Sequence, residues 1–336
     1  MNVWIKRSSL LIAGCLLFLL NACSSADTPN QEAKGNLKKV SIMLDWYPNA
    51  VHAGIYDAIE KGYFKNEGIE VDVKMPAETN DPLKLVAAGR TDLALTYQPQ
   101  VVLSRSEDIP IVSLGALVRH PLNHLMVSKN SPIRSPKDLE GKNVGYPSIP
   151  INEAMVKTMV KQDGGNPEKV KMTDVGWDII PAMAAHKVDG ISGGYINHEK
   201  ILLNKEGHAV RSIDPVKYGV PDYYELVLVS SEDGLKKNRK LYQKFWNALA
   251  KGQKDVHDHP DQALNVLFKH ENKEFPLDEN VEKKSLQTLL PLMDSGKKPF
   301  GYQDLGSWKQ VSDWLFESKM IKKKEDPKNA FINFEK

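Results

Sequence analysis

The sequence has 336 residues, of which 41% are apolar and 26% are charged, a composition typical of a globular protein. This length allows two cores of roughly 100 to 200 residues each, so we expect two domains. Lysine and arginine are spread among aspartate and glutamate, and the formal net charge is only +2. These features argue against a nucleic-acid-binding protein.

The N-terminus differs in composition from the rest of the chain. Two basic residues precede an apolar run over residues 10–20, which ends shortly before Cys23. Such a run is too short to span roughly 30 Å of hydrocarbon as a permanent anchor helix, which is the alternative, but it suits a cleaved export signal. The residues leading to Cys23 resemble a bacterial lipobox. We therefore predict a signal peptide over 1–22 and lipidation of Cys23.

The segment that follows, 23–37, is polar and rich in small residues, as expected of a flexible tether. Cys15 lies inside the predicted signal, so the mature chain has no cysteine other than Cys23 and no thiolate metal site. We expect the protein on the extracytoplasmic face of a bacterial cell membrane, held there by its lipid anchor only.

From residue 38, short β-rich runs alternate with helical patterns, which predicts parallel βαβ units. The first series has strands at 40–44, 69–75 and 93–96 and helices near 52–62 and 83–88. After the Pro- and Ser-containing stretch 128–136, a second series has strands at 143–146 and 188–192 and a helix at 152–162. The repeated alternation predicts two α/β lobes.

Two segments about 97 residues apart resemble each other. Residues 85–94 read LVAAGRTDLA and residues 182–191 read AMAAHKVDGI, with two alanines, a base and an aspartate at equivalent positions. Each is typical of a helix end, a tight turn and the next strand, so the two lobes are predicted to share one plan.

The remainder of the chain predicts a return to the first lobe. A strand is expected at 225–230, followed by helices near 239–257, 261–268, 279–290 and 307–318. We assign 38–127 plus 226–330 to lobe 1 and 128–225 to lobe 2. A chain that leaves one lobe and returns later forms a hinge. Ligands of open α/β sheets bind beyond the carboxyl ends of the strands, so a cleft between the lobes is expected.

The segment 44–64, LDWYPNAVHAGIYDAIEKGYF, resembles the opening motif of the thiamin-pyrimidine family, which includes fungal pyrimidine synthases and bacterial importer receptors. The segments KNEGIEVD from Lys65, GRTDLALTY from Gly89 and DLEGKNVGYPS from Asp138 fit the same family, and the resemblance spans about 37–321. It implies an α/β, two-lobed periplasmic-binding-protein fold of type II, with a hinge and a ligand cleft between the lobes.

The resemblance also implies a function. The receptors of this family belong to ABC importers, so a permease and its cytoplasmic ATPase are the implied partners. The implied ligand is a thiamin-precursor pyrimidine, N-formyl-4-amino-5-aminomethyl-2-methylpyrimidine, captured for thiamin salvage. Riboflavin or another heterocycle is the alternative ligand. We expect a monomer without cofactor, metal ion or nucleic acid.

A small heterocycle needs flat faces for stacking and a few directed polar groups. In the receptors, aromatic residues at the positions of Trp46 and Tyr195 sandwich the pyrimidine, and the resemblance implies the same role here; Trp46 packed in the core is the alternative. Glu199 follows Tyr195 by four residues, which places both on one side of a helical turn. We expect its carboxylate to accept the exocyclic amine, with a solvated helix face as the alternative.

Further ligand-binding candidates follow from loop position together with polarity or aromaticity. They are Asp45, Asn49, Tyr97, Gln98, Ser148, Trp177, Tyr223 and Glu225. Since alternate residues of a strand point to opposite faces, at most two of residues 223–225 are expected to contact ligand. We expect His52 to orient its loop rather than to touch the ligand.

A synthase of the same family is the main rival function. Where the fungal synthases carry a lysine and a histidine, this sequence has Thr96 and Gln100, and where they carry clustered cysteines it has 222–225, DYYE. The sequence also lacks GxSxG, HExxH and Walker-type motifs. We therefore predict a binding protein and not an enzyme. A structural or adhesive lipoprotein is the alternative from another class.

Overall fold

The computed structural model describes residues 37–334, which belong to one compact unit, Asn36–Lys336. The predicted signal peptide, Cys23 and the tether up to residue 36 lie outside the described residues. Among the residues that are described, no helix is both long enough and apolar enough to cross a membrane.

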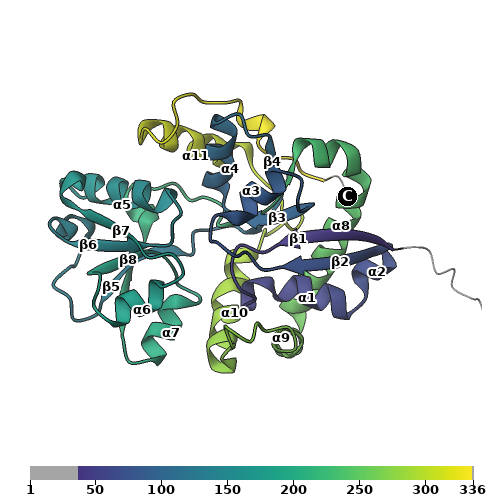
Figure 1. Ribbon diagram of the computed structural model, residues 1–336, viewed down its shortest axis with the longest axis horizontal. Helices are drawn as coiled ribbons and strands as arrows, with labels where there is room; N and C mark the ends of the chain where they lie inside the picture. Colours follow the sequence, from purple (N-terminus) through teal and green to yellow (C-terminus); the bar gives the residue numbers. More distant parts are fainter. Residues whose placement is uncertain (1–36, 335–336) are drawn as a thin grey trace, which may run out of the picture. The chain divides into compact units, whose positions relative to one another are not determined.

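Two mixed five-stranded sheets form the framework of this unit (Figure 1). The strands of the first sheet are β1 (Lys38–Met43), β2 (Ile69–Lys74), β3 (Leu93–Thr96), β4 (Ile111–Val118) and β10 (Leu226–Ser231). Their order is β2-β1-β3-β10-β4. Strand β1 is parallel to β2 and β3, whereas β10 is antiparallel to β3 and β4.

The second sheet repeats this topology. Its strands are β5 (Asn123–Ser128), β6 (Asn143–Tyr146), β7 (Lys171–Asp174), β8 (Gly190–Tyr195) and β9 (Val210–Ile213), in the order β7-β6-β8-β5-β9. Strand β6 is parallel to β7 and β8, and β5 is antiparallel to β8 and β9. The similar segments 85–94 and 182–191 run into β3 and β8, which hold the same place in the two sheets. The shared plan is thus confirmed.

The position of β5 corrects the lobe boundary that the sequence suggested at 127/128. Residues 123–127 were assigned to lobe 1, but they form most of β5, which pairs with β8 and β9. The stretch 128–136 connects β5 with β6 inside the second lobe. The chain therefore crosses between the sheets at 119–122 and returns at 214–225. From here on, lobe 1 and lobe 2 denote the first and second sheets with their helices.

Helices cover both sheets. Lobe 1 has α1 (Ala53–Glu60), α2 (Tyr63–Asn66), α3 (Asp81–Ala87), α4 (Gln98–Ser106), α8 (Glu232–Asp258), α9 (Pro260–Phe268), α10 (Glu279–Met293) and α11 (Leu305–Glu317). Lobe 2 has α5 (Ile151–Gln162), α6 (Ile179–Ala184) and α7 (Glu199–Lys205). In Figure 1, α1, α9 and α10 lie on one side of the first sheet and α3, α4 and α11 on the other.

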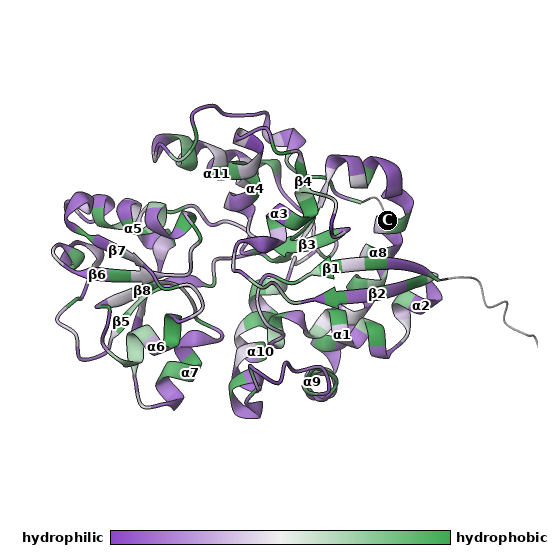
Figure 2. Cartoon of the chain, in the orientation of Figure 1, coloured by the Kyte–Doolittle hydropathy of each residue, from purple (hydrophilic) through white to green (hydrophobic). Residues whose placement is uncertain are grey.

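The core explains why these runs become strands. Strands β3 and β4 are buried along their whole length, and both are largely green, that is hydrophobic, in Figure 2. Gly115 in β4 lies beneath the indole of Trp246 from α8, and a Cβ built there would be 2.3 Å from that ring. Glycine at this position therefore allows α8 to pack closely on β4.

Candidate functional site

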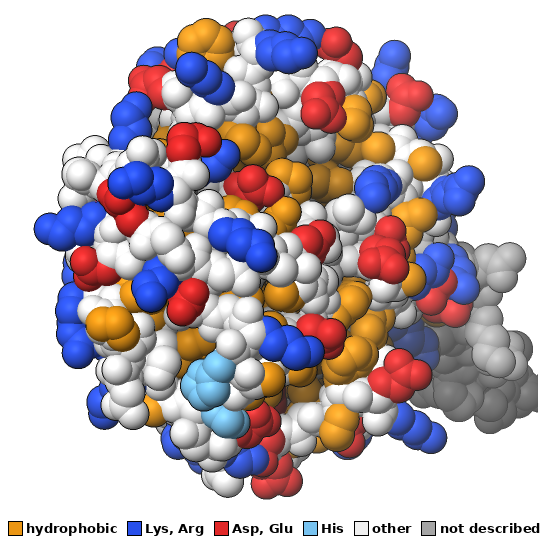
Figure 3. Space-filling view, turned by 60° about the vertical axis from the view of Figure 1, so that its left-hand side comes forward, with side chains coloured by type: hydrophobic (Ala, Val, Ile, Leu, Met, Phe, Trp, Pro, Cys, Tyr) orange, Lys and Arg blue, Asp and Glu red, His pale blue; other side chains and the backbone are white. Residues whose placement is uncertain are grey.

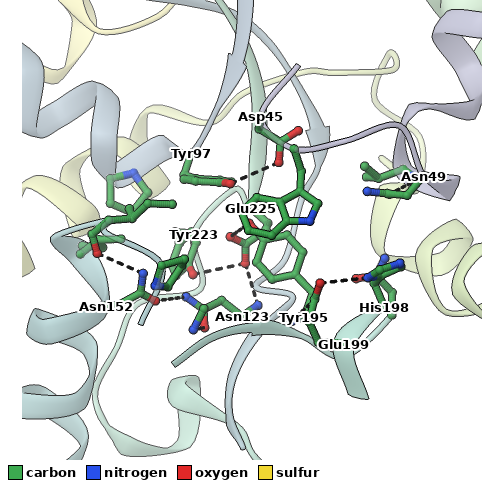
Figure 4. A pocket seen from close by; sticks show the side chains of 18 residues that line it. Asp45, Asn49, Tyr97, Asn123, Asn152, Tyr195, His198, Glu199, Tyr223 and Glu225 are labelled. Atoms are coloured by element: carbon green, nitrogen blue, oxygen red, sulfur yellow. Dashed lines mark hydrogen bonds and ion pairs between the residues drawn. The ribbon is translucent and has the colours of Figure 1, made fainter. Parts of the chain in front are cut away.

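A cavity lies between the two lobes, at the carboxyl ends of their inner strands (Figure 4). The loops after β1, β3 and β6 and the end of β8 all reach it, as expected from the alternation of strands and helices. The return crossing contributes Tyr223 and Glu225. The cavity is therefore built from both lobes and from the segments that join them.

Asp45 forms the part of the cavity wall that follows β1. Its carboxylate is buried and accepts hydrogen bonds from His52 Nε2 at 2.9 Å and from the Tyr97 hydroxyl at 3.2 Å. His52 Nδ1 accepts the backbone N–H of Asn49, so the neutral ring can donate through Nε2. His52 is fully buried and does not line the cavity. It orients Asp45 and the loop.

Glu225 joins the two crossing segments. Its Oε2 accepts the backbone N–H groups of Leu122 at 2.7 Å and Asn123 at 2.9 Å, while its Oε1 accepts the Tyr195 hydroxyl at 3.1 Å. The Tyr223 hydroxyl also donates to Oε2. Burial raises the pKa of Glu225 to about 7, although these donors favour the ionised form.

Amide side chains connect this carboxylate with the second sheet. Asn123 donates to Asn152 Oδ1 at 2.7 Å and accepts the backbone N–H of Gly193 at 2.7 Å. Gly193 has φ of +97°, and a Cβ there would be 2.5 Å from Pro147. Glycine is thus required for the close approach of β8 to the loop after β6. These hydrogen bonds fix the positions of Asn123 and Asn152, which line the cavity.

Glu199 stands at the first position of α7. It accepts the backbone N–H of Tyr195 at 2.8 Å and lies 2.9 Å from Nδ1 of His198. The expected arrangement of Tyr195 and Glu199 on one helical turn is wrong, because Tyr195 ends β8 and Glu199 begins the next helix. Burial disfavours the charged imidazole, but Glu199 and Glu282 outweigh it and raise the pKa of His198 to about 10.

The aromatic rings form two groups. Tyr97 and Tyr195 meet edge to face, with ring centroids 6.3 Å apart. Burial raises the pKa of both hydroxyls, so they keep their protons and donate to carboxylates. Trp46 lines the cavity, and its ring centroid lies 4.0 Å from that of Trp177, which comes from lobe 2. Tyr195 and Trp46 thus bring aromatic rings from opposite lobes to one cavity.

Eight of the eleven predicted ligand-binding residues line this cavity, and three do not. Gln98 begins α4, and its side chain bonds to the backbone N–H of Tyr224 and to Ser307. Ser148 donates to Asp174 within lobe 2. Trp177 contacts Trp46 from outside the lining, with the two rings tilted by 39°, and donates to the carbonyl of Ala77 at 3.3 Å.

Four polar lining residues were not predicted. Asn123 begins β5, Asn152 lies in the first turn of α5, and Asn197 and His198 precede α7. The sequence offered a signal only for His198, which is adjacent to the candidate Glu199. The roles of the three asparagines depend on tertiary contacts.

The chemistry of the cavity favours a neutral or cationic ligand with several N–H donors. Asp45, Glu199 and Glu225 supply acceptors, and the residues described around the cavity include neither lysine nor arginine. His198 is the cationic group that the lining does contain, and Glu199 and Glu282 balance its charge. A phosphate or sulfonate group would lack the basic partners that it needs. No group of three potential metal ligands occurs in residues 37–334.

The outer surface carries mixed charges. Figure 3 shows Lys and Arg side chains interspersed with Asp and Glu, with apolar side chains gathered in a hollowed band across the viewed face. Such an arrangement agrees with the small net charge of the sequence. The selective chemistry lies in the cavity rather than in a charged surface field.

Comparisons with known proteins show which sequences this chain resembles. A family described as NMT1/THI5 like matches residues 49–263. The Formylaminopyrimidine-binding protein of Halalkalibacterium halodurans is 45% identical over 311 residues, which cover 92% of each chain. The Riboflavin-binding protein RibY of Chloroflexus aurantiacus is 25% identical, with 96% of each chain covered.

The fold also matches solved structures. The alkanesulfonate-binding protein SsuA of Xanthomonas axonopodis pv. citri superimposes with a TM-score of 0.70, covering 89% of this chain and 100% of that one, at 12% identity. An identity this low indicates a common fold and nothing about the ligand. The expected two-lobed α/β periplasmic-binding-protein fold is confirmed.

Proposed function

Because the chain belongs to the NMT1/THI5-like family, we propose that it is the solute-binding receptor of an ABC importer and captures a formylaminopyrimidine for thiamin salvage. The observation that carries this proposal is the cavity between the lobes, where aromatic rings and buried carboxylates occur together and the described lining residues include no lysine or arginine. The H. halodurans relative, whose name states this ligand, supports the choice of pyrimidine.

Recognition would combine stacking with hydrogen bonds. We propose that Trp46 and Tyr195 hold the two faces of the ring, since each contributes an aromatic side chain from its own lobe. A 4-aminopyrimidine offers an exocyclic amine to a carboxylate such as Glu199 and ring nitrogens to hydroxyl or amide donors. Asp45, Asn49, Tyr97, Tyr223 and Glu225 also line the cavity and remain candidates for these polar contacts.

The same cavity argues against synthase chemistry. Thr96 and Gln100 take the places of the lysine and histidine of the fungal synthases, and both line a small second cavity beside Asp45 and Tyr97. The described lining offers no lysine for a Schiff base and no basic side chain for the phosphate of pyridoxal phosphate. Binding and release, without chemical conversion, is the activity that we propose.

The rest of the proposal concerns location and partners. We propose that residues 1–22 direct export, that Cys23 carries the lipid, and that an ABC permease with its cytoplasmic ATPase accepts the ligand. The family of importer receptors supports these partners, and the lipobox-like residues before Cys23 support the anchor.

Calorimetry on the body that starts after Cys23 tests the ligand. Titration with N-formyl-4-amino-5-aminomethyl-2-methylpyrimidine should give saturable one-site binding, and a hundredfold excess over Kd should stabilise the protein by about 2.7 kcal/mol in a thermal-shift assay. Trp46→Ala should lose most of this affinity, because base stacking on an aromatic side chain contributes about 1–3 kcal/mol. Trp308→Phe, in the core and outside the cavity lining, is the control for a change at a buried indole.

Riboflavin and pyridoxal phosphate complete the panel. Tighter binding of riboflavin would keep the receptor function and overturn the pyrimidine. Conversion of pyridoxal phosphate would overturn the binding-protein proposal. If no compound of the panel binds, a structural lipoprotein becomes the better explanation.

A further inference from the structure

Helix α10 contacts the lobe opposite to its own. It packs against the 3-10 helix η1 (Ala50–His52) of lobe 1 and also against α7 of lobe 2. Three side chains at its N-terminal end reach lobe 2. Asp278, which caps the helix, pairs with Lys205, while Glu282 lies 3.5 Å from His198 and Ser285 accepts Asn197 Nδ2 at 3.0 Å. Asn197 and His198 follow β8 closely and line the cavity, and Lys205 ends α7.

Glu282 is anchored firmly on the lobe 1 side. It is only 1% exposed, and its Oε2 accepts the backbone N–H of Ala50 at 2.7 Å. Ala50 follows Asn49, a cavity residue whose side chain caps η1 by accepting the N–H of Val51. Glu282 does not line the cavity itself, but it is hydrogen-bonded to the loop that does.

His198 receives Glu282 from the lobe 2 side. The ring lies between two carboxylates, with Nδ1 2.9 Å from Glu199 of its own lobe and Nε2 3.5 Å from Glu282 of the other. Glu199 would hold the imidazolium whether the cleft is open or closed, because both residues belong to lobe 2. Glu282 belongs to lobe 1, so its contact with His198 bridges the two lobes.

We propose that Glu282 is the closure latch of this receptor: it binds His198 when lobe 2 closes over the ligand and so slows ligand release. This inference rests on the proposed function. A charge pair that becomes buried on closure has strict geometric demands, which makes it selective for one position of the lobes. Ser285 with Asn197, and Asp278 with Lys205, would fix the same position from either side.

A double-mutant cycle tests the latch. Glu282→Gln keeps an acceptor for the Ala50 N–H but removes the charge that faces His198, and His198→Gln removes the other member of the pair. With the formylaminopyrimidine as ligand, Glu282→Gln should raise the dissociation rate about tenfold or more and change the association rate little. In a protein that already carries His198→Gln, Glu282→Gln should change the dissociation rate little. Glu279→Gln, on an exposed position of the same helix, is the control.

A second measurement can also be made without ligand. The body after Cys23 contains no cysteine, so Lys61→Cys in lobe 1 and Lys187→Cys in lobe 2, both exposed, accept a pair of spin labels. We expect Glu282→Gln to shift the distance distribution toward longer distances, both without ligand and at subsaturating ligand. The Glu279→Gln control should match the parent.

The outcomes separate the two proposals. Additive single-mutant effects on dissociation, or unchanged label distances in Glu282→Gln, would overturn the latch. The coupling energy between Glu282 and His198 can be measured both from ligand dissociation and from thermal unfolding of the ligand-free protein. Equal values would also overturn the latch, since a permanent structural contact predicts that result. If the parent protein does not bind the pyrimidine, the proposed function fails, and the label distances still decide on the latch.

Discussion

Glu225 accepts hydrogen bonds from donors in three segments of the chain. Leu122 and Asn123 lie where the outgoing crossing enters β5, Tyr223 lies in the return crossing and Tyr195 ends β8. One buried carboxylate therefore connects the two crossing segments with an aromatic residue of the cavity. A movement of lobe 2 would change these hydrogen bonds at the same time. We therefore regard Glu225 as the residue that links the conformation of the hinge with the position of Tyr195 in the cavity.

The raised pKa of Glu225 leads to a pH prediction. The pKa of the folded state is about 7, whereas the ordinary value is 4.5. The stabilising contribution of the proton is therefore fully present below about pH 4.5 and is lost as the pH rises through 7. Over this window the unfolding free energy should fall with pH, with a slope from this group of at most about 1.4 kcal/mol per pH unit.

Glu225→Gln removes this titration. Its amide can turn one oxygen to the two backbone N–H groups, so we expect the variant to fold. Urea unfolding at pH 5, 6, 7 and 8 should show the variant less stable than the parent at pH 5, with a difference that narrows toward pH 8. A difference that does not depend on pH would contradict the assignment. Glu279→Gln, again, provides the matched exposed control.

At the scale of the elements, the pattern of strands and helices was predictable and the pairing partners were not. The runs at 40–44, 69–75 and 93–96 became β1, β2 and β3, because apolar β-branched residues next to a helix pattern indicate a buried parallel strand. Strand β5 was missed as the start of lobe 2. Its own residues suit a strand of either sheet, and only pairing with β8 and β9 decides the question.

The candidate site shows the same limit. Asp45, Tyr97 and Tyr195 were predictable because they stand at or just beyond the ends of inner strands, which meet at one edge of a sheet. Gln98 and Ser148 also follow inner strands, but their side chains bond to the backbone of Tyr224 and to Asp174 and do not line the cavity. Asn123 was missed because its role depends on Asn152 and Gly193, which are distant in the sequence.

The contact between β4 and α8 gives a prediction for stability. Gly115→Ala places a Cβ against the buried Trp246 ring, so it should lower the unfolding free energy by about 1–3 kcal/mol without changing ligand affinity. Gly306→Ala is the matched control, because Gly306 lies in α11 with open space around it. Alanine there should stabilise the helix by up to about 1 kcal/mol. Urea unfolding and calorimetry on both variants provide the comparison.

Equal behaviour of the two alanine variants would contradict the packing that we describe. A loss of ligand affinity in Gly115→Ala would indicate that the β4 and α8 contact influences the cleft, which the local geometry does not suggest. Comparison of Gly115→Ala with Gly306→Ala thus separates the effect of replacing a glycine in the backbone from the steric clash with the Trp246 ring.

At the scale of the molecule, contacts between the lobes surround the cavity. On one side, the Thr79 hydroxyl donates to the carbonyl of Pro147 at 2.9 Å and Trp177 covers Trp46. On another, α10 meets the residues after β8 through Glu282 and Ser285. A ligand held in the cavity would be released only after these contacts separate. Closure should therefore control the dissociation rate more than the association rate.

Trp177 offers the clearest test of that expectation, because it crosses between the lobes without lining the cavity. Trp177→Ala removes the ring contact with Trp46 and the hydrogen bond to the Ala77 carbonyl, so stopped-flow measurements should show pyrimidine dissociation about tenfold faster. Trp177→Phe keeps an aromatic ring, so its dissociation rate should fall between those of the parent protein and Trp177→Ala. The unfolding temperature of the ligand-free protein should change little, since the lobes can separate in that state. A lowered unfolding temperature with unchanged dissociation would instead assign Trp177 to the packing of its own lobe.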